Sequence, residues 1–214
     1  MKTKAPHTKP QKNTLNTQTR PSSSGGNGEV RLIGGQWKRS KLTVLNLLGL
    51  RPTPSRVRET LFNWLGQDLT GLRCVDAFSG SGALGFEAAS RGAADVLLIE
   101  QDAKLIANLE ANKTRLKASN IRIQRGDCIQ ILRNQPKNSV DVIFLDPPFD
   151  SGHFLEAIEA CALVLSAQGA LYLEAPEAWN NEKLAALGLH IIKQAKAGAV
   201  HFHLLSKNIK GIQA

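Results

Sequence analysis

From Leu72 onward, short apolar runs of strand length alternate with amphipathic segments of helical period. We expect strands at residues 73–77, 95–100, 121–125, 140–146, 170–174, 189–194 and 199–205. We expect helices between them at residues 83–91, 102–118, 128–134, 152–165 and 180–187. Such alternation is typical of βαβ units, which form a mostly parallel sheet with helices on both faces. The pattern therefore predicts an α/β fold with a seven-stranded sheet.

Antiparallel hairpins are expected near both ends of the chain. Only residues 196–198 separate the last two strands, which is too short for a parallel crossover. Near the other end, the β-like runs 30–33 and 41–44 flank two glycines and a basic tip with Lys38 and Arg39. These runs predict a small hairpin or an extended basic arm.

A helix is expected after the segment 51–54, because Thr53 can cap a helix and Pro54 can open one. Four apolar residues then recur at helical spacing, namely Val57, Leu61, Trp64 and Leu65. The opposite side of this helix offers Arg56 and Arg58, so we expect it to present positive charge.

The net charge of +9 comes entirely from the first 60 residues. Residues 1–28 contain five basic residues and no acid, and residues 29–60 contain seven basic residues and two acids. The rest of the chain is nearly balanced, with 15 basic and 16 acidic residues. This asymmetry suggests a front segment that faces a polyanion, joined to a nearly neutral body.

Composition divides the chain into three parts. Residues 1–28 contain only three apolar residues, which cannot offset the entropy of ordering, so we predict a disordered basic tail. We expect this tail to add non-specific, salt-sensitive affinity for a polyanion without supporting the fold. Residues 29–66 form the basic front segment, and residues 67–214 form the α/β domain. A hydrophobic content of 42% suits one domain with a full core.

No metal site, disulfide framework or membrane span is expected. Cys74, Cys128 and Cys161 form no CxxC pair, and His201 and His203 share one face of a strand but lack further ligands. No apolar run approaches the roughly 18 to 20 residues of a membrane span, and no secretory signal is recognisable. We therefore expect a protein of the reducing cytoplasm.

A glycine-rich turn follows the first strand of the α/β domain. The sequence from Asp76 to Gly85 contains a GxGxxG pattern with Gly80 and Gly82, between a strand and a helix. In a doubly wound sheet, ligands bind beyond the carboxyl ends of the strands, where glycines let the backbone approach a nucleotide. The alternative interpretation is a tight turn that simply needs glycine.

Acidic residues end the next two strands. Glu100 ends the second strand, where an acid can accept hydrogen bonds from both ribose hydroxyls of an adenosine ligand. Asp127 and Cys128 follow the third strand, where a carboxylate or a backbone amide can read an adenine edge. Asp127 alone is also a good helix N-cap. Cys128 could serve as a nucleophile, but no histidine stands at a recognisable partner position.

The fourth strand ends in Asp146-Pro147-Pro148-Phe149. Two prolines fix φ twice and remove two N–H donors, so the carbonyls of this loop stay free to accept hydrogen bonds. The carboxylate of Asp146 and the carbonyl of Pro147 can hold the exocyclic amine of a planar base, while Phe149 stacks on its ring. The alternative is a strand-ending turn beside a core phenylalanine.

These strand-end motifs resemble those of Rossmann-like, S-adenosylmethionine-dependent methyltransferases that modify exocyclic amines. The matching residues are Asp76, Phe78, Gly80, Gly82, Glu100, Asp127, Asp146, Pro147, Pro148 and Phe149. The front segment narrows the resemblance to the bacterial RsmD family, through the run 30–38, then Arg51-Pro-Thr53 and the run 56–62. The resemblance covers about residues 29–206, and the tail before it lies outside the pattern.

The resemblance implies an enzyme that methylates the 2-amino group of a guanine in 16S ribosomal RNA, within an assembled or assembling small subunit. S-adenosylmethionine is then the cofactor, held by the glycine turn with Phe78, by Glu100, and by Asp127 with Cys128. The segment 29–66 becomes an RNA-binding or lid segment, with phosphate contacts from Lys38, Arg39, Arg51, Thr53, Arg56 and Arg58. A monomer is expected.

Other functions fit parts of the sequence. The loop at Asp146 alone suits an adenine or cytosine amine as well as a guanine. The glycine turn and Glu100 also permit an NAD-dependent dehydrogenase, although Asp-Pro-Pro-Phe has no part in hydride chemistry. A non-catalytic ribosome assembly factor with a relic pocket is the alternative outside enzymes.

Overall fold

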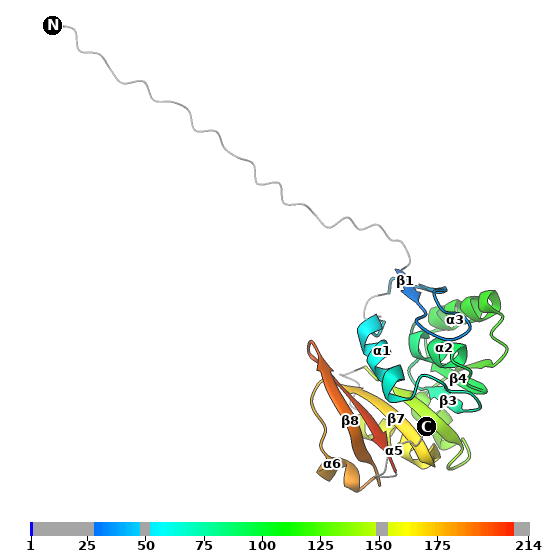
Figure 1. Ribbon diagram of the computed structural model, residues 1–214, viewed down its shortest axis with the longest axis vertical. Helices are drawn as coiled ribbons and strands as arrows, with labels where there is room; N and C mark the ends of the chain where they lie inside the picture. Colours follow the sequence, from blue (N-terminus) through cyan, green and yellow to red (C-terminus); the bar gives the residue numbers. More distant parts are fainter. Residues whose placement is uncertain (2–27, 48–51, 149–153, 208–214) are drawn as a thin grey trace.

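The computed structural model describes Met1 and residues 28–47, 52–148 and 154–207. Within these ranges the main sheet has seven strands in the order β5-β4-β3-β6-β7-β9-β8 (Figure 1). Its strands are β3 (Arg73–Asp76), β4 (Asp95–Glu100), β5 (Ile121–Arg125), β6 (Val140–Leu145), β7 (Leu165–Ala175), β8 (His190–Ala197) and β9 (Val200–Ser206). The strands β3 to β7 are parallel, and β9 pairs antiparallel with both β7 and β8. The predicted α/β sheet with a terminal antiparallel hairpin is confirmed.

Helices cover both faces of this sheet. The helices are α1 (Ser55–Trp64), α2 (Ala83–Ser90), α3 (Ala103–Leu116), α4 (Cys128–Arg133), α5 (Phe154–Val164) and α6 (Asn181–Ala185). Apolar residues of α1, α2 and α3 form one buried cluster against the sheet, and those of α4, α5 and α6 form a second cluster on its other face. These two-sided contacts explain why the strands β4 and β6 are almost continuously apolar.

The start of β7 differs from the sequence-based expectation. The strand begins at Leu165, directly after α5, whereas the apolar pattern predicted a start at residue 170. Val140 pairs with Leu165, but Val142 pairs with Ala170, so the ladder contains an irregularity. The residues in between include a polar, glycine-containing stretch that carries no apolar alternation, which is why the pattern missed them.

The front segment forms the expected hairpin and helix, and both pack into the main core. The strands β1 (Gly28–Arg31) and β2 (Lys41–Val44) pair antiparallel, and Val30, Leu32 and Leu42 join the same buried cluster as α2. On the other side of the hairpin, the side-chain amides of Asn108 and Asn112 on α3 donate to the Thr43 carbonyl at 2.8 and 2.9 Å. The hairpin is therefore part of the folded body (Figure 1).

The beginning of α1 corrects one sequence-based detail. Pro54 occupies the N-cap position and no side chain caps the helix, so the prediction that Thr53 caps it is wrong. Instead, the Thr53 carbonyl accepts a hydrogen bond from Nε of Arg58 at 3.2 Å. The helix start is thus held by a guanidinium that reaches back from its first turn.

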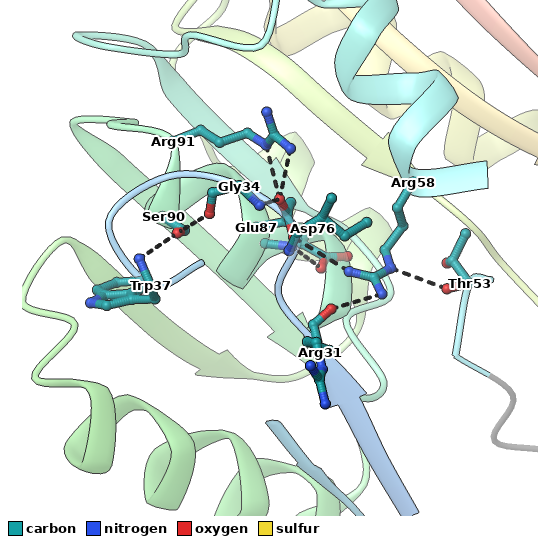
Figure 2. A network of polar contacts seen from close by, with 11 residues as sticks. Arg31, Gly34, Trp37, Thr53, Arg58, Asp76, Glu87, Ser90 and Arg91 are labelled. Carbon is teal, nitrogen blue, oxygen red and sulfur yellow. Dashed lines mark hydrogen bonds and ion pairs between the residues drawn. The ribbon is translucent and has the colours of Figure 1, made fainter. Parts of the chain in front are cut away.

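A buried carboxylate, Glu87 of α2, anchors the front segment (Figure 2). The backbone N–H groups of Ile33 and Gly34 donate to it at 2.8 and 2.7 Å. The guanidinium of Arg91 approaches it at 2.9 Å and that of Arg58 at 3.4 Å. Because both oxygens receive charged and backbone donors, a carboxylate with 0% exposure is fully compensated here.

Candidate cofactor and target-amine site

A large cavity opens at the carboxyl ends of the parallel strands, with a volume of about 1290 Å³. Its walls come from the glycine turn, the ends of β4, β6 and β7, the start of α1 and the turn between β8 and β9. The sequence-predicted residues that line it are Thr53, Asp76, Phe78, Gly80, Glu100, Cys128, Asp146, Pro147 and Pro148. The fold therefore brings residues from four separate strand ends to one site, as expected for an open α/β sheet.

The glycine turn owes its shape to close packing. Gly80 and Gly82 adopt positive φ angles of 49° and 76°, and a Cβ at Gly82 would lie 2.6 Å from the Leu109 side chain. A Cβ at Gly85 would lie 2.1 Å from the Leu98 side chain, so only glycine lets α2 approach the sheet here. Gly82 does not line the cavity, and its role is to shape the turn beside it.

Asp76 ties this turn to the sheet. Its Oδ2 accepts a hydrogen bond from the Gly85 N–H at 2.9 Å, and its side chain is buried at the cavity wall. Burial raises the pKa of Asp76 to about 7, while the Gly85 N–H lowers it and the negative charge of Glu100 raises it. Asp76 therefore shapes the site in addition to facing it.

Glu100 is also held by backbone donors. Its Oε2 accepts from the Gly80 N–H at 2.9 Å, and its Oε1 accepts from the N–H groups of Gln101 and Asp102 at 2.7 and 2.9 Å. These bonds fix the carboxylate at the cavity edge and connect β4 to the glycine turn. A carboxylate has about four lone-pair positions, so it can still accept from a ligand hydroxyl.

Asp127 and Cys128 fill different roles at the end of β5. Asp127 is the N-cap of α4, where its Oδ1 accepts from the Gln130 N–H at 2.9 Å, which confirms the capping alternative. It does not line the cavity, whereas Cys128 does. Burial raises the pKa of Cys128 to about 12, so its thiol stays protonated at neutral pH and is a poor nucleophile.

Half-buried Asp146 and buried Glu174 form an acidic pair at the ends of β6 and β7. Burial, Glu174 and Asp76 together raise the pKa of Asp146 to about 8. Burial also raises the pKa of Glu174, against hydrogen bonds from the Tyr172 and Thr53 side chains. Neither acid forms an ion pair within the described part of the chain. Sequence analysis missed Glu174, although its place at the end of the fifth parallel strand was the available signal.

The residues predicted to contact RNA lie in different environments. Lys38 and Arg39 are exposed at the hairpin turn, and Arg56 is exposed on α1. Arg58 is only 3% exposed, so the expectation of a phosphate contact is wrong for this residue. Its guanidinium instead binds Glu87 and donates to the Arg31 carbonyl at 3.1 Å (Figure 2). Thr53 is buried at the cavity wall, which does not suit an outward phosphate contact.

Two predicted residues, Arg51 and Phe149, lie outside the described residues. Among the residues that are described, no cluster of three or more histidine, cysteine or acidic side chains could hold a metal ion. No helix in the described ranges is long and apolar enough to cross a membrane.

Comparisons with known proteins give the family of this chain. The family model described as conserved hypothetical protein 95 matches residues 30–206. Ribosomal RNA small subunit methyltransferase D from Escherichia coli strain K12 is 38% identical over 196 residues, which cover 90% of this chain and 96% of that protein.

Solved structures agree with this assignment. The structure of yhhF from Escherichia coli has a TM-score of 0.71 at 37% identity and covers 87% of this chain and 100% of that one. A precorrin-6y C5,15-methyltransferase from Geobacter metallireducens shares the fold alone, with a TM-score of 0.59 at 16% identity over 76% of this chain and 92% of that one. The chain therefore has the class I methyltransferase fold and belongs to the RsmD family.

Proposed function

We propose that this protein transfers a methyl group from S-adenosylmethionine to the 2-amino group of a guanine in 16S ribosomal RNA. The observation that carries the proposal is the position of Asp146 and Pro147 in the same cavity as the glycine turn and Glu100. One end of the cavity thus suits a nucleoside cofactor, and the other suits an amine. The relative from Escherichia coli, a ribosomal RNA small subunit methyltransferase, supports RNA as the substrate.

The residues of the cavity fit S-adenosylmethionine. Glu100 would hold a ribose hydroxyl, the backbone of the turn at Gly80 would lie against the cofactor, and the amide beside Cys128 would face the adenine ring. Asp76 and Phe78 line the same wall. When bound, the cofactor supplies an electrophilic methyl group on a sulfonium and leaves as a neutral thioether.

Asp146 and Pro147 hold and orient the target amine in this mechanism. A carboxyl oxygen of Asp146 and the Pro147 carbonyl accept hydrogen bonds from the two amine hydrogens, which draws the nitrogen lone pair out of the ring and toward the cofactor end of the cavity. Asp146 need not act as a strong base, because a methylated amine nitrogen is cationic and releases its proton readily. Pro148 keeps the loop rigid, and Phe149 is proposed to stack on the flipped base.

The front segment is proposed to bind the RNA backbone. Lys38, Arg39 and Arg56 present exposed positive charge, and Arg51 adds to it in sequence. Phosphate contacts of this kind give affinity and position without reading sequence. We propose that the substrate is rRNA within an assembled or assembling small subunit, and that the enzyme acts as a monomer in the cytoplasm.

The test uses small subunits from a strain that lacks this enzyme, incubated with purified protein and S-adenosylmethionine. We expect one N2-methylguanosine per 16S rRNA by nucleoside mass spectrometry, and a loss of that product with Asp146→Ala. A methylated adenine or cytosine would contradict the guanine assignment. Calorimetric titration with S-adenosylhomocysteine should show binding, whereas tight binding of NAD instead would contradict the cofactor assignment.

A further inference from the structure

Asp146 and Glu174 follow matched positions on neighbouring parallel strands. Leu145 of β6 pairs with Leu173 of β7, so the next residues on both strands stand side by side at the edge of the sheet. Both acids line the cavity, together with Pro147. The site therefore presents two acidic acceptors next to each other, and the proposed mechanism uses only one of them.

Glu174 is held in place by its own strand. Its side chain is 5% exposed, and Oε1 accepts a hydrogen bond from the buried Tyr172 hydroxyl at 2.7 Å. Tyr172 lies two residues earlier, on the same face of β7, which directs the Glu174 carboxylate along that face. A carboxylate fixed in this way keeps lone pairs for a further donor.

The pair lacks the partners that buried acids usually have. Within the described ranges, no lysine, arginine or histidine forms an ion pair with Asp146 or Glu174. Elsewhere in the same domain, the buried Glu87 has two arginines and two backbone donors. Two adjacent acceptors without a cation, Glu174 buried and Asp146 half-buried at the cavity wall, are suited to a neutral ligand that carries two adjacent N–H donors.

In guanine, the 2-amino group and the neighbouring ring N1–H form such a pair of donors. The ring N1 next to that amine bears a hydrogen, whereas the ring nitrogen next to the amine of adenine or cytosine is an acceptor. A carboxylate that faces this position would attract guanine and repel the other two bases. Enzymes that flip a base out of its stack read it through hydrogen bonds along this edge.

We infer that Glu174 is a specificity-determining residue that accepts a hydrogen bond from guanine N1–H while Asp146 and Pro147 hold the 2-amino group. The inference rests on the proposed guanine methylation and assigns the base selectivity of that reaction to one side chain. Asp146 then serves any exocyclic amine, and Glu174 selects which base can present it.

The test compares two bases at the methylated position of reconstituted small subunits. One is guanine, and the other is 2-aminopurine, which has the same amine but an acceptor at N1. We expect wild-type enzyme to prefer guanine by roughly 100-fold or more in kcat/KM. Glu174→Gln can turn its amide N–H toward the N1 acceptor of 2-aminopurine, so the preference should fall by at least about 10-fold. 2-Aminopurine also lacks the O6 atom of guanine. This loss affects the wild-type enzyme and Glu174→Gln equally, so it does not change the comparison between them.

Glu177→Gln is the matched control, because Glu177 lies three residues away with an exposed side chain that approaches Lys183 at 3.6 Å. It should keep the wild-type preference. Melting curves and binding of S-adenosylhomocysteine to Glu174→Gln report whether fold and cofactor site are intact, and both should match wild type. If Glu174→Gln still turns over with an unchanged base preference, the role of Glu174 is overturned.

Failure of the underlying function has a different signature. Wild-type enzyme that forms no N2-methylguanosine on guanine-containing subunits overturns the proposed function and this inference together. If Glu174→Gln loses its fold or its cofactor binding, Tyr172→Phe replaces it as the second variant, since it keeps the Glu174 carboxylate but removes one of the two side-chain hydrogen bonds that position it, the other coming from Thr53. The preference for guanine should then fall by a smaller factor, and an unchanged preference again overturns the role of Glu174.

Discussion

Two sites in the described part of the chain hold carboxyl groups away from solvent, and they differ in whether a cation compensates them. At Glu87, two guanidiniums and two backbone N–H groups compensate one fully buried acid. At the ends of β6 and β7, Asp146 and Glu174 lie together without a cation in the described part of the chain, and burial raises the pKa of both. The first arrangement stabilises the fold, and the second keeps hydrogen-bonding capacity for a ligand at the expense of stability.

The difference gives a way to separate structural acids from functional ones. Glu174 is buried like Glu87, so burial alone does not distinguish the two kinds. What differs is whether the protein supplies all the donors. A carboxylate that is left short of donors in a cavity is a candidate for contact with substrate, and changing it should alter activity more than stability.

The largest expected effect follows from removal of the charge at the compensated site. Glu87→Gln leaves the guanidiniums of Arg58 and Arg91 buried without a counter-charge and should lower the free energy of unfolding by about 3–5 kcal/mol. Urea denaturation measures it. Glu110→Gln on α3 is the control, since Glu110 is exposed and only approaches Lys113 at 3.8 Å, and it should change stability by less than about 0.5 kcal/mol. A loss under about 1 kcal/mol for Glu87→Gln would show that the two sites do not differ as described.

Asp146→Asn should show the opposite pattern, with a loss of activity and no loss of stability. We expect kcat for methyl transfer to fall at least about 100-fold, because the amine loses its carboxyl acceptor and its alignment. The melting temperature at neutral pH should not fall, because a carboxyl with a pKa of about 8 is already mostly neutral and the amide has nearly the same shape. Single-turnover kinetics and thermal melting measure both quantities. If Asp146→Asn were destabilised instead, Asp146 would be an acid that stabilises the fold, as Glu87 is.

The pH dependence of stability sharpens the comparison further. The native Asp146 carboxyl, with a pKa of about 8, binds a proton that the unfolded chain releases near its ordinary value of 3.8. Wild-type stability should therefore decline as the pH rises between these values. The melting temperature of Asp146→Asn relative to wild type should rise by several degrees across this window and level off above it. Thermal melts from about pH 4 to pH 9 measure it, and a constant difference would contradict the raised pKa.

The smallest effect concerns the exposed charges of the hairpin turn. Replacing Lys38 and Arg39 with alanine should weaken binding to the small subunit and reduce the slope of log affinity against log salt by about 0.7 to 0.9 for each phosphate that is no longer neutralised. The melting temperature should stay the same, because both side chains are exposed. Fluorescence anisotropy at several salt concentrations gives the slope, and an unchanged slope would show that these two residues do not bind the RNA.

The sequence allowed the α/β fold, the order of its elements along the chain and part of the cavity wall to be predicted, because strands alternate with helices and several strands end in glycine, acid or proline motifs. Glu174 also ends its expected strand, but neither a glycine turn nor a pair of prolines follows it, and so it was missed. Arg58 was misassigned because helical spacing alone does not show that a guanidinium turns inward. Its partners, Glu87 and the Arg31 carbonyl, are distant in sequence, and the packing of α1 against α2 and β1 brings them together.

The position of Arg58 bears on which RNA substrates can fit the protein. Its guanidinium bonds the Arg31 carbonyl in the basic hairpin, the Thr53 carbonyl at the rim of the cavity, and Glu87 in the core. Arg58 thus connects the hairpin, which is proposed to bind the RNA backbone, to the cavity, which is proposed to bind the target base. The distance between the basic hairpin and the cavity is therefore fixed. An RNA whose phosphate and target base are separated by a different distance can bind at the hairpin or place its base in the cavity, but not both.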